Sequence, residues 1–413
     1  MHNNSAFIKA PPHFILNGEV NIPASKSESN RALLLNALGE RNSEIINLSE
    51  ANDTILLRKI LDGNDFQINV EDAGTTARFL TAYYSATESH KIISGSERMN
   101  ERPMKDLIAA LQTLGANIQS LSTPYQLPIE IKPQKLKGGE IEIDASMSSQ
   151  FISALMMIAP TLENGLHIRF NSEVNSFPYL ELTAGMLKKF GVEVLLSEKE
   201  VFISQQKIRN SIIQINGDWS AASFFICMAA LSSESNFLMR GIQLNSLQGD
   251  EILVTWMRKV GLEIMQEADG VRIIKSNPVT LLANYDFHSY PDLALPVIVT
   301  AAAMNQEIVF EGVETLQWKE SNRMKAIEKE LVKKGVSIIQ TLAHQYSLKG
   351  QLNDEEVCFD TYSDHRMAMS LTLLAMKCGS VQLNDPMVVK KSFPSFYMEL
   401  QKLGFEISFS DLL

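Results

Sequence analysis

The chain has 413 residues, of which 45% are hydrophobic and 21% charged, and a formal net charge of −11. This composition predicts two or three folded domains with a substantial core and excludes a mainly disordered chain. The acidic excess argues against general nucleic-acid binding. No apolar run approaches the roughly 18 residues of a membrane helix, and residues 1–12 lack the apolar core of a signal peptide. We therefore expect a cytoplasmic protein without a nucleic-acid or membrane partner.

The cysteines Cys227, Cys358 and Cys378 are too few and too scattered for a disulfide framework or a zinc site. Cys227 lies in a strongly apolar run, and we expect it to be a buried small hydrophobic residue. The cysteines therefore predict no metal site.

Six short polar clusters each follow a strand-like run and precede a long apolar, helix-like run. In chain order they lie at residues 25–31, 74–78, 146–150, 218–220, 290–292 and 363–366. Because Ser, Thr and Asp are preferred helix N-caps, the clusters predict helix starts. Successive markers lie 48, 73, 72, 72 and 71 residues apart, and are Ser27, Thr75, Ser148, Ser220, Asp292 and Ser363.

A second marker repeats with the first. Each unit later contains an amphipathic stretch that ends in glycine, as expected where a helix stops. These glycines follow their markers by 36 to 43 residues, and are Gly63, Gly115, Gly191, Gly261, Gly335 and Gly404. The pattern predicts six α/β units of strand, helix, strand, helix, strand and often a further strand. This period exceeds the roughly 20 to 50 residues of solenoid repeats.

The predicted helix starts and their surroundings concentrate cations in an otherwise acidic chain. Free N–H groups at a helix start favour anions, and lysine or arginine side chains strengthen such a site. For any single residue a solvated surface charge is the simpler interpretation, but the set indicates a site for a small anionic ligand. Its members are Lys26, Arg31, Arg78, Arg102, Lys319, Arg323, Arg366 and Lys391.

Two segments allow both a structural and a functional interpretation. Asp292 begins an apolar helix-like run, where an ordinary N-cap is favoured over a general base. A helix would place Lys319 and Arg323 on one face at i,i+4, with Glu320 offset. Like charges at that spacing repel, which suggests an anion between them, but a solvated helical turn is an equal alternative.

In order, and over nearly the whole chain, these segments resemble the enolpyruvyl transferases, and among them the EPSP synthase family. The resemblance implies an α/β fold of two similar domains, each of three βαβαββ units (an inside-out α/β barrel), with the active site in the interdomain cleft. It places residues 18–216 in one domain and residues 1–17 plus 217–413 in the other. The matching segments are Lys26-Ser27 with 29–31, 73–75 with Arg78, 101–103, 148–150, Ser176 with 178–179, 217–218, 291–292, 319–320 with Arg323, 364–369, and Lys391 with 393–394.

The resemblance implies transfer of the enolpyruvyl (carboxyvinyl) group of phosphoenolpyruvate to the 5-hydroxyl of shikimate 3-phosphate. The reaction is an addition–elimination that releases phosphate, in chorismate and aromatic amino-acid biosynthesis. Asp292 would accept the hydroxyl proton, Glu320 would donate a proton, and Lys26 and Lys391 would assist. No cofactor or metal is implied, because phosphoenolpyruvate is itself activated. We expect a monomer.

The same resemblance implies two sets of substrate contacts. Those of shikimate 3-phosphate would be Lys26, Ser27, Arg31, Ser148, Ser149, Gln150, Ser176, Asp292, Thr315 and Lys319. Those of phosphoenolpyruvate would be Lys26, Gly74, Arg102, Gln150, Arg323, His365, Arg366 and Lys391. Ala24 stands where the family usually has Gly, Asp72 where Asn is common, and Thr315 where some members have a ligand-binding Asn. These departures bear on affinity more than on reaction type.

Two other functions are possible. The sister enzymes that transfer enolpyruvate to a UDP-N-acetylglucosamine acceptor carry a cysteine in a mobile loop of the first domain, whereas the first half of this chain has none. A non-catalytic anion-binding relative is the second alternative. The presence of Asp292, Glu320, Lys26 and Lys391 argues against it.

Overall fold

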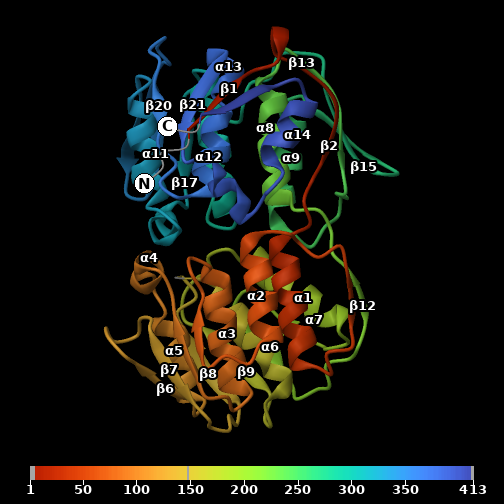
Figure 1. The fold of residues 1–413 in the computed structure, drawn as a ribbon, viewed down its shortest axis with the longest axis vertical. Helices are drawn as coiled ribbons and strands as arrows, with labels where there is room; N and C mark the ends of the chain where they lie inside the picture. Colours follow the sequence, from red (N-terminus) through yellow and green to blue (C-terminus); the bar gives the residue numbers. More distant parts are fainter. Residues whose placement is uncertain (1–4, 147, 411–413) are drawn as a thin grey trace. The chain divides into compact units, whose positions relative to one another are not determined.

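The computed structural model describes residues 5–146 and 148–410. The chain divides into a C-terminal unit, Met1–Ala24 with Asn216–Leu413, and an N-terminal unit, Ser25–Ile215 (Figure 1). The expected ranges differ from this division at residues 18–24 and 216, and their ends, 1–4 and 411–413, lie outside the described residues. Residues 18–24 join the C-terminal unit because β2 (Ile15–Asn21) pairs in parallel with β13 (Glu234–Arg240).

Three sheets with one topology show the repeat directly. Two parallel strands are joined through a helix, and a second helix leads to an antiparallel hairpin whose last strand pairs with the second parallel strand. In the N-terminal unit these sheets have the orders β4 (Gln67–Asn69), β5 (Lys91–Ser94), β7 (Ile129–Lys132), β6 (Asn117–Ser120), and β8 (Gly139–Ile143), β9 (Leu166–Phe170), β11 (Glu200–Ile203), β10 (Leu195–Leu196). In the C-terminal unit the order is β16 (Asn284–Asp286), β17 (Val309–Glu311), β19 (Gln345–Gly350), β18 (Val336–Leu342).

Two further sheets of the C-terminal unit complete this topology with strands from the start of the chain. In one, β2 supplies the first strand beside β13, followed by β15 (Gly270–Lys275) and β14 (Glu263–Glu267). In the other, β1 (Ser5–Lys9) lies between β21 and β22 and is antiparallel to both. The order of that sheet is β20 (Cys358–Phe359), β21 (Ser380–Asn384), β1, β22 (Glu406–Ser410).

The first unit of the repeat departs from the other five. Its sheet contains a parallel pair, β3 (Glu44–Ile46) and β12 (Ile212–Gln214), and no hairpin among the described strands. Gly63, which ends its second helix, has a φ of −87°. The corresponding glycines of the other units have φ from 77° to 107°, the left-handed conformation that reverses the chain after a helix. The expected α/β fold with three sheets in each described unit is therefore confirmed, with one incomplete repeat.

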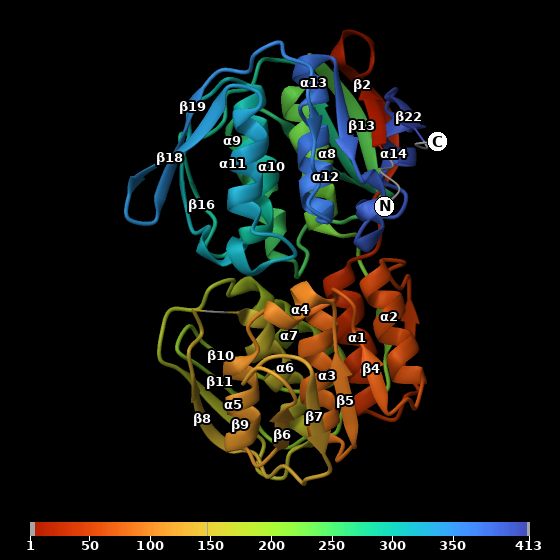
Figure 2. The same cartoon turned by 60° about the vertical axis from the view of Figure 1, so that its left-hand side comes forward.

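Each unit has three inner helices that are buried on nearly every side (Figure 2). They are α1 (Lys26–Leu38), α3 (Gly74–Ala86) and α6 (Ser149–Ile158) in the N-terminal unit, and α8 (Trp219–Leu231), α10 (Ala294–Ala303) and α12 (His365–Thr372) in the C-terminal unit. Within their units, α3 packs against α1 and α6, and α10 packs against α8 and α12. A helix that is covered on nearly every side belongs to the core of its unit, even where, as in α1, it carries charged residues. The inner helices therefore form the centre of each unit, and each begins at or next to one of the predicted polar clusters.

The remaining helices are outer helices or short connections. The outer helices are α2 (Asn52–Asp62), α5 (Lys105–Thr113), α7 (Pro178–Lys189), α9 (Ile252–Lys259), α11 (Arg323–Val332) and α14 (Phe396–Lys402). The short ones are α4 (Glu97–Glu101), α13 (Ala375–Cys378), and the 3-10 turns η1 (Pro12–Phe14), η2 (Ala159–Thr161), η3 (Gly249–Glu251), η4 (Pro291–Leu293), η5 (Glu314–Trp318) and η6 (Pro386–Lys391). Within the described ranges, no helix combines the length and the apolar character needed to cross a membrane. Cys227 is fully buried in α8, as expected.

Candidate active site

The starts of four inner helices are capped by a residue of the predicted clusters, but only in α6 is the cap the predicted marker, Ser148. Ser25 caps α1 by accepting a hydrogen bond from the Glu28 N–H at 3.3 Å. Ser148 accepts from the Gln150 N–H at 3.3 Å, and Asp364 accepts from the Arg366 N–H at 3.0 Å. These caps satisfy backbone donors at the helix starts and hold the following side chains in place.

At the starts of α8, α3 and α10, the predicted marker lies inside the helix or just before it. Asp218 caps α8 by accepting from the Ala221 N–H at 2.9 Å, so Ser220 lies inside the helix. Helix α3 begins at Gly74 without a side-chain cap, which places Thr75 in its first turn. Asp292 lies inside η4, whose N-cap is Tyr290, and the N-cap of α10 is Leu293, so the favoured N-cap interpretation is wrong. Its carboxylate instead enters the ion-pair network described below.

In the N-terminal unit, Lys26 and Arg31 face different surroundings along α1. The Lys26 Nζ lies 3.1 Å from Oδ2 of Asp53, a buried carboxylate on α2. The sequence does not indicate Asp53 as the partner of Lys26, because nothing in its segment distinguishes Asp53 from an ordinary acid at a helix start. This ion pair fixes Lys26 at the first residue of the helix.

The Arg31 guanidinium is 2% exposed and is bound by neutral oxygens. Its Nε donates to Thr183 Oγ1 at 2.8 Å, and its Nη1 donates to the Ser27 carbonyl at 3.0 Å. Its Nη2 donates to Ser153 Oγ at 3.2 Å. Burial lowers the pKa of Arg31 to about 10, although Tyr179 and Glu28 oppose the shift. Arg31 therefore joins α1 to α6 and α7, and its expected contact with phosphate stays a prediction.

Gly74 lies directly against two arginines. A Cβ at this position would meet the Arg78 guanidinium and would lie 2.6 Å from Arg102 Nη1. Arg102 is 5% exposed, and its Nε has no hydrogen-bond partner within the described structure. Asp72 accepts a hydrogen bond from Ser96 Oγ. The glycine thus leaves room for a buried cationic pair, an arrangement suited to a carboxylate or phosphate.

The start of α6 is joined to the start of α3. The Gln150 Nε2 donates to Thr75 Oγ1 at 3.2 Å. Ser149 is buried, and Ser176 is buried with a φ of 63° just before α7. The N-terminal unit therefore brings together the expected residues at the starts of α3 and α6, while Ser176 belongs to the turn that precedes α7.

The C-terminal unit holds the densest ion-pair network of the described structure. Arg323, the first residue of α11, donates to Asp364 through Nε at 2.8 Å and Nη2 at 3.2 Å. The same guanidinium reaches Asp292 Oδ1 at 3.2 Å and Glu320 Oε2 at 2.8 Å. Burial would lower the pKa of Arg323, but Asp364, Glu320 and Asp292 outweigh burial and raise it above its usual value. Arg323 is therefore a permanent cation shared by three carboxylates.

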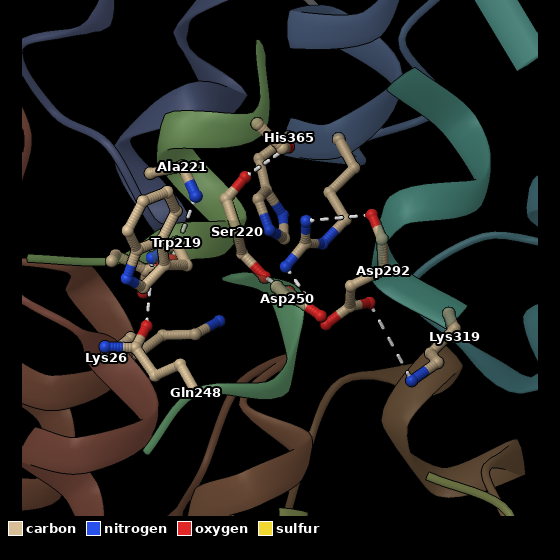
Figure 3. A network of polar contacts seen from close by, with 12 residues as sticks. Lys26, Trp219, Ser220, Ala221, Gln248, Asp250, Asp292, Lys319 and His365 are labelled. Atoms are coloured by element: carbon tan, nitrogen blue, oxygen red, sulfur yellow. Dashed lines mark hydrogen bonds and ion pairs between the residues drawn. The ribbon is translucent and has the colours of Figure 1, made fainter. Parts of the chain in front are cut away.

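Asp292 lies among three cations, of which Lys319 is labelled in Figure 3. Its Oδ2 is 3.0 Å from Arg366 Nη2, and its Oδ1 is 4.0 Å from Lys319 Nζ. Burial would raise the pKa of Asp292, but Arg366, Lys319 and Arg323 outweigh burial and lower it well below its usual range. The side chain is thus an ionised carboxylate at neutral pH.

The segment around Lys319 differs from the expected helical turn. Lys319 ends η5 in an extended conformation and α11 begins only at Arg323, so the expected i,i+4 pair on one helix face is wrong. Lys391, at the end of η6, has its Nζ 3.7 Å from Glu320 Oε1. Thr315 is half-buried in η5. The ion pairs of Lys319 with Asp292 and of Lys391 with Glu320 therefore join loops and helix ends, and do not lie along one helix.

His365 and Asp250 complete the surroundings of the network. His365 is 2% exposed, and its Nδ1 lies 3.7 Å from Asp364 Oδ1. Asp250, in η3, accepts a hydrogen bond from Ser220 Oγ (Figure 3). Burial and the nearby Asp292 raise the pKa of Asp250 to about 7, against the opposing effect of Arg366 and Ser220. Nothing in the sequence marks Asp250 as part of this site, because its segment offers no more signal than an acid after glycine.

The arrangement can bind an anion and can hold groups that move protons. Lys319, Arg323 and Arg366 lie within 4.0 Å of the Asp292 carboxylate, and Lys391 lies near Glu320. In a buried site these charges interact more strongly than in water. An anion that binds the cations would compete with Asp292 for them. No described group of His, Cys, Asp and Glu side chains has a metal-binding arrangement.

Comparison with known proteins identifies a matching family and several similar proteins. The model of the family described as EPSP synthase (3-phosphoshikimate 1-carboxyvinyltransferase) matches residues 12–63 and 56–400. A 3-phosphoshikimate 1-carboxyvinyltransferase of Bacteroides fragilis (strain YCH46) is 36% identical, over 94% of this chain and 95% of that protein. The proteins of the same name from Histophilus somni (strain 2336) and Sulfurovum sp. (strain NBC37-1) are 33% and 32% identical, over 94% and 97% of this chain and 97% and 99% of their own.

The fold also has solved counterparts. The structure of EPSP synthase from Acinetobacter baumannii superposes with a TM-score of 0.78 and covers 98% of this chain and all of that one. Its identity of 20% makes this a likeness of fold alone. Because the family model spans more than half of the chain and the sequence relatives exceed 30% identity, the chain belongs to the EPSP synthase (3-phosphoshikimate 1-carboxyvinyltransferase) family.

Proposed function

We propose that this chain transfers the enolpyruvyl group of phosphoenolpyruvate to the 5-hydroxyl of shikimate 3-phosphate. The hydroxyl oxygen adds to C2 of phosphoenolpyruvate while C3 gains a proton. The tetrahedral adduct then loses phosphate from C2 and a proton from C3, which restores the double bond. The products are 5-enolpyruvylshikimate 3-phosphate and phosphate. Family membership and relatives over more than nine-tenths of the chain support this reaction.

One observation carries the proposal most directly: the Asp292 carboxylate lies within 4.0 Å of Lys319, Arg323 and Arg366. These cations keep Asp292 ionised, but they also make it a weak base. Substrate phosphate or carboxylate groups that bind the same cations would weaken their hold on Asp292. The pKa of Asp292 would then rise toward the value at which a carboxylate removes a hydroxyl proton efficiently. Substrate binding would thereby activate the base.

Glu320 and Lys391 are proposed to move the C3 proton. Glu320 is held by Arg323 at 2.8 Å on one oxygen and lies 3.7 Å from Lys391 on the other. A carboxyl group and an ammonium group at this distance can pass a proton between them or through a water molecule. His365 and Arg366, at the start of α12, are proposed to bind phosphoenolpyruvate together with Lys391.

The N-terminal unit is proposed to supply two groups of contacts. Gly74 and Arg102, with the cation Lys26 and the amide of Gln150, would bind phosphoenolpyruvate, because Gly74 leaves room for the buried pair of Arg78 and Arg102. The shikimate 3-phosphate contacts would be Lys26, Ser27, Arg31, Ser148, Ser149, Gln150 and Ser176, with Asp292, Thr315 and Lys319 from the C-terminal unit. We further propose a cytoplasmic monomer, an inference that rests on composition and family alone.

Phosphate release from phosphoenolpyruvate tests the acceptor. We expect release with shikimate 3-phosphate and none with UDP-N-acetylglucosamine as the acceptor. Release with the UDP-sugar alone would assign the chain to the sister activity. Release with neither acceptor would support a non-catalytic anion-binding protein.

Glu320→Gln tests the proton-transfer role. The amide can still accept the hydrogen bond from Arg323 but cannot donate an acidic proton. We expect turnover to fall roughly a hundredfold or more while the Kd for shikimate 3-phosphate changes little. Loss of binding with little effect on the chemical step would instead make Glu320 a structural residue.

A further inference from the structure

The backbone just before α12 is in an uncommon conformation. Tyr362 and Ser363 have φ angles of 55° and 53°, the left-handed region, and neither is glycine. Each such residue costs on the order of 1 kcal/mol, so the turn persists only if surrounding contacts hold it. The next residue is Asp364, which caps α12 and binds Arg323. Strain is therefore located directly beside the ion-pair network.

A buried carboxylate outside the network holds this turn. Glu330 lies on α11, is fully buried, and accepts a hydrogen bond from the Tyr362 hydroxyl at 2.6 Å. Its second oxygen accepts from the Asp360 N–H at 3.0 Å and from Lys333 Nζ at 2.5 Å. Burial and the bond to Glu330 raise the pKa of Tyr362, which keeps the phenol protonated as a donor. One side chain thus binds the segment on both sides of Thr361.

Helix α11 contacts the segment at two separate points. Its first residue, Arg323, binds Asp364, and Glu330, seven residues later, binds Asp360 and Tyr362. Seven residues are about two turns, or roughly 10 Å along the axis, and bring side chains back to the same face. Because the helix is rigid over two turns, the position of the strained turn is coupled to that of Arg323.

From these contacts we infer that Glu330 and Tyr362 are positioning residues for the reaction. Their hydrogen bond holds the left-handed turn so that Asp364 orients Arg323, which in turn contacts Asp292 and Glu320. Neither residue is placed in contact with substrate by the proposed function, on which this inference rests. The bridge acts on the geometry of the proton-transfer groups.

Tyr362→Phe removes the hydroxyl and keeps the ring. We expect kcat to fall about tenfold, the effect of losing a hydrogen bond to a charged group, with KM values changed less than about threefold. Glu330→Gln combined with Tyr362→Phe should lower kcat no further than the more severe single change, because the bond that Tyr362→Phe removes is one of those that the change at Glu330 weakens. Additive losses, or an unchanged kcat in Tyr362→Phe, would overturn the inference.

Ser363→Gly provides a rescue that a general loss of stability does not predict. Glycine adopts the left-handed conformation without strain, so the turn depends less on the bridge. In the Tyr362→Phe background, Ser363→Gly should restore at least about a third of the lost kcat. Failure to restore kcat would contradict strain as the link between bridge and activity.

A matched control and a substrate-independent measurement complete the test. Tyr285→Phe also removes a buried hydroxyl of the C-terminal unit, one that accepts a backbone N–H at 3.2 Å, and should leave kcat unchanged. Hydrogen exchange of residues 361–367, measured without substrates, should accelerate about tenfold in Tyr362→Phe but not in Tyr285→Phe. Equal exchange in both variants would overturn the inference. An inactive wild type would refute only the proposed function.

Discussion

Replacing Asp364 by Asn tests how much the buried network contributes to stability. The carboxylate is fully buried and accepts two hydrogen bonds from Arg323, at 2.8 and 3.2 Å, one from Ser321 and one from the Arg366 N–H. Breaking a buried ion pair costs about 3–5 kcal/mol. Arg323 keeps two other carboxylates, and Asn still caps a helix, so we expect the lower end of this range. The unfolding equilibrium should therefore shift roughly a hundredfold.

Urea unfolding followed by tryptophan fluorescence measures this effect selectively. The tryptophans of the chain, Trp219, Trp256 and Trp318, all belong to the C-terminal unit. The matched control is Asp269→Asn, which removes an exposed partner of Arg240 at 3.1 Å in the same unit and should cost about 1 kcal/mol or less. A loss in Asp364→Asn no larger than that in the control would refute the view that the network stabilises the unit.

Three further predictions concern activity and pH. Gly74→Ala should raise the KM for phosphoenolpyruvate roughly tenfold with a smaller effect on kcat, because the added Cβ displaces the Arg102 guanidinium; an unchanged KM would contradict this. Asp292→Asn should lower kcat at least about a hundredfold, and a smaller loss would exclude Asp292 as the base. Asp250, with a folded pKa near 7 against 3.8 as the reference, binds more protons when folded, so wild-type stability should fall between pH 4 and pH 7. Asp250→Asn should abolish that fall, measured as unfolding midpoints from pH 4 to 8; parallel curves would contradict the raised pKa.

The repeat could be predicted from the sequence because local chemistry repeats with it. Polar clusters at helix starts and glycines at helix ends depend on neighbouring residues, and five of the six glycines have the left-handed conformation that a chain reversal requires. The exception, Gly63, ends the helix after which no described hairpin follows. The glycine without the left-handed conformation thus coincides with a real difference in topology.

What the sequence did not predict depends on contacts between distant segments. The boundary at residue 24 is set by the pairing of β2 with β13, more than 200 residues later. Asp292 looks like a cap in its own segment, and its ion pairs with Arg366 and Arg323 appear only when the helix starts meet. Asp53 and Asp250 carry no local signal at all. Residue types at helix starts were predictable, but their partners were not.

The fate of the C3 hydrogens of phosphoenolpyruvate tests the central claim most directly. If the reaction is an addition–elimination, C3 passes through a methyl group that gains one proton from the site and then loses one. In deuterium oxide with shikimate 3-phosphate, mass spectrometry should therefore find deuterium at C3 of the enolpyruvyl product, and Glu320→Gln should slow its appearance in parallel with turnover. A product formed at the wild-type rate without deuterium at C3 would contradict the proposed mechanism.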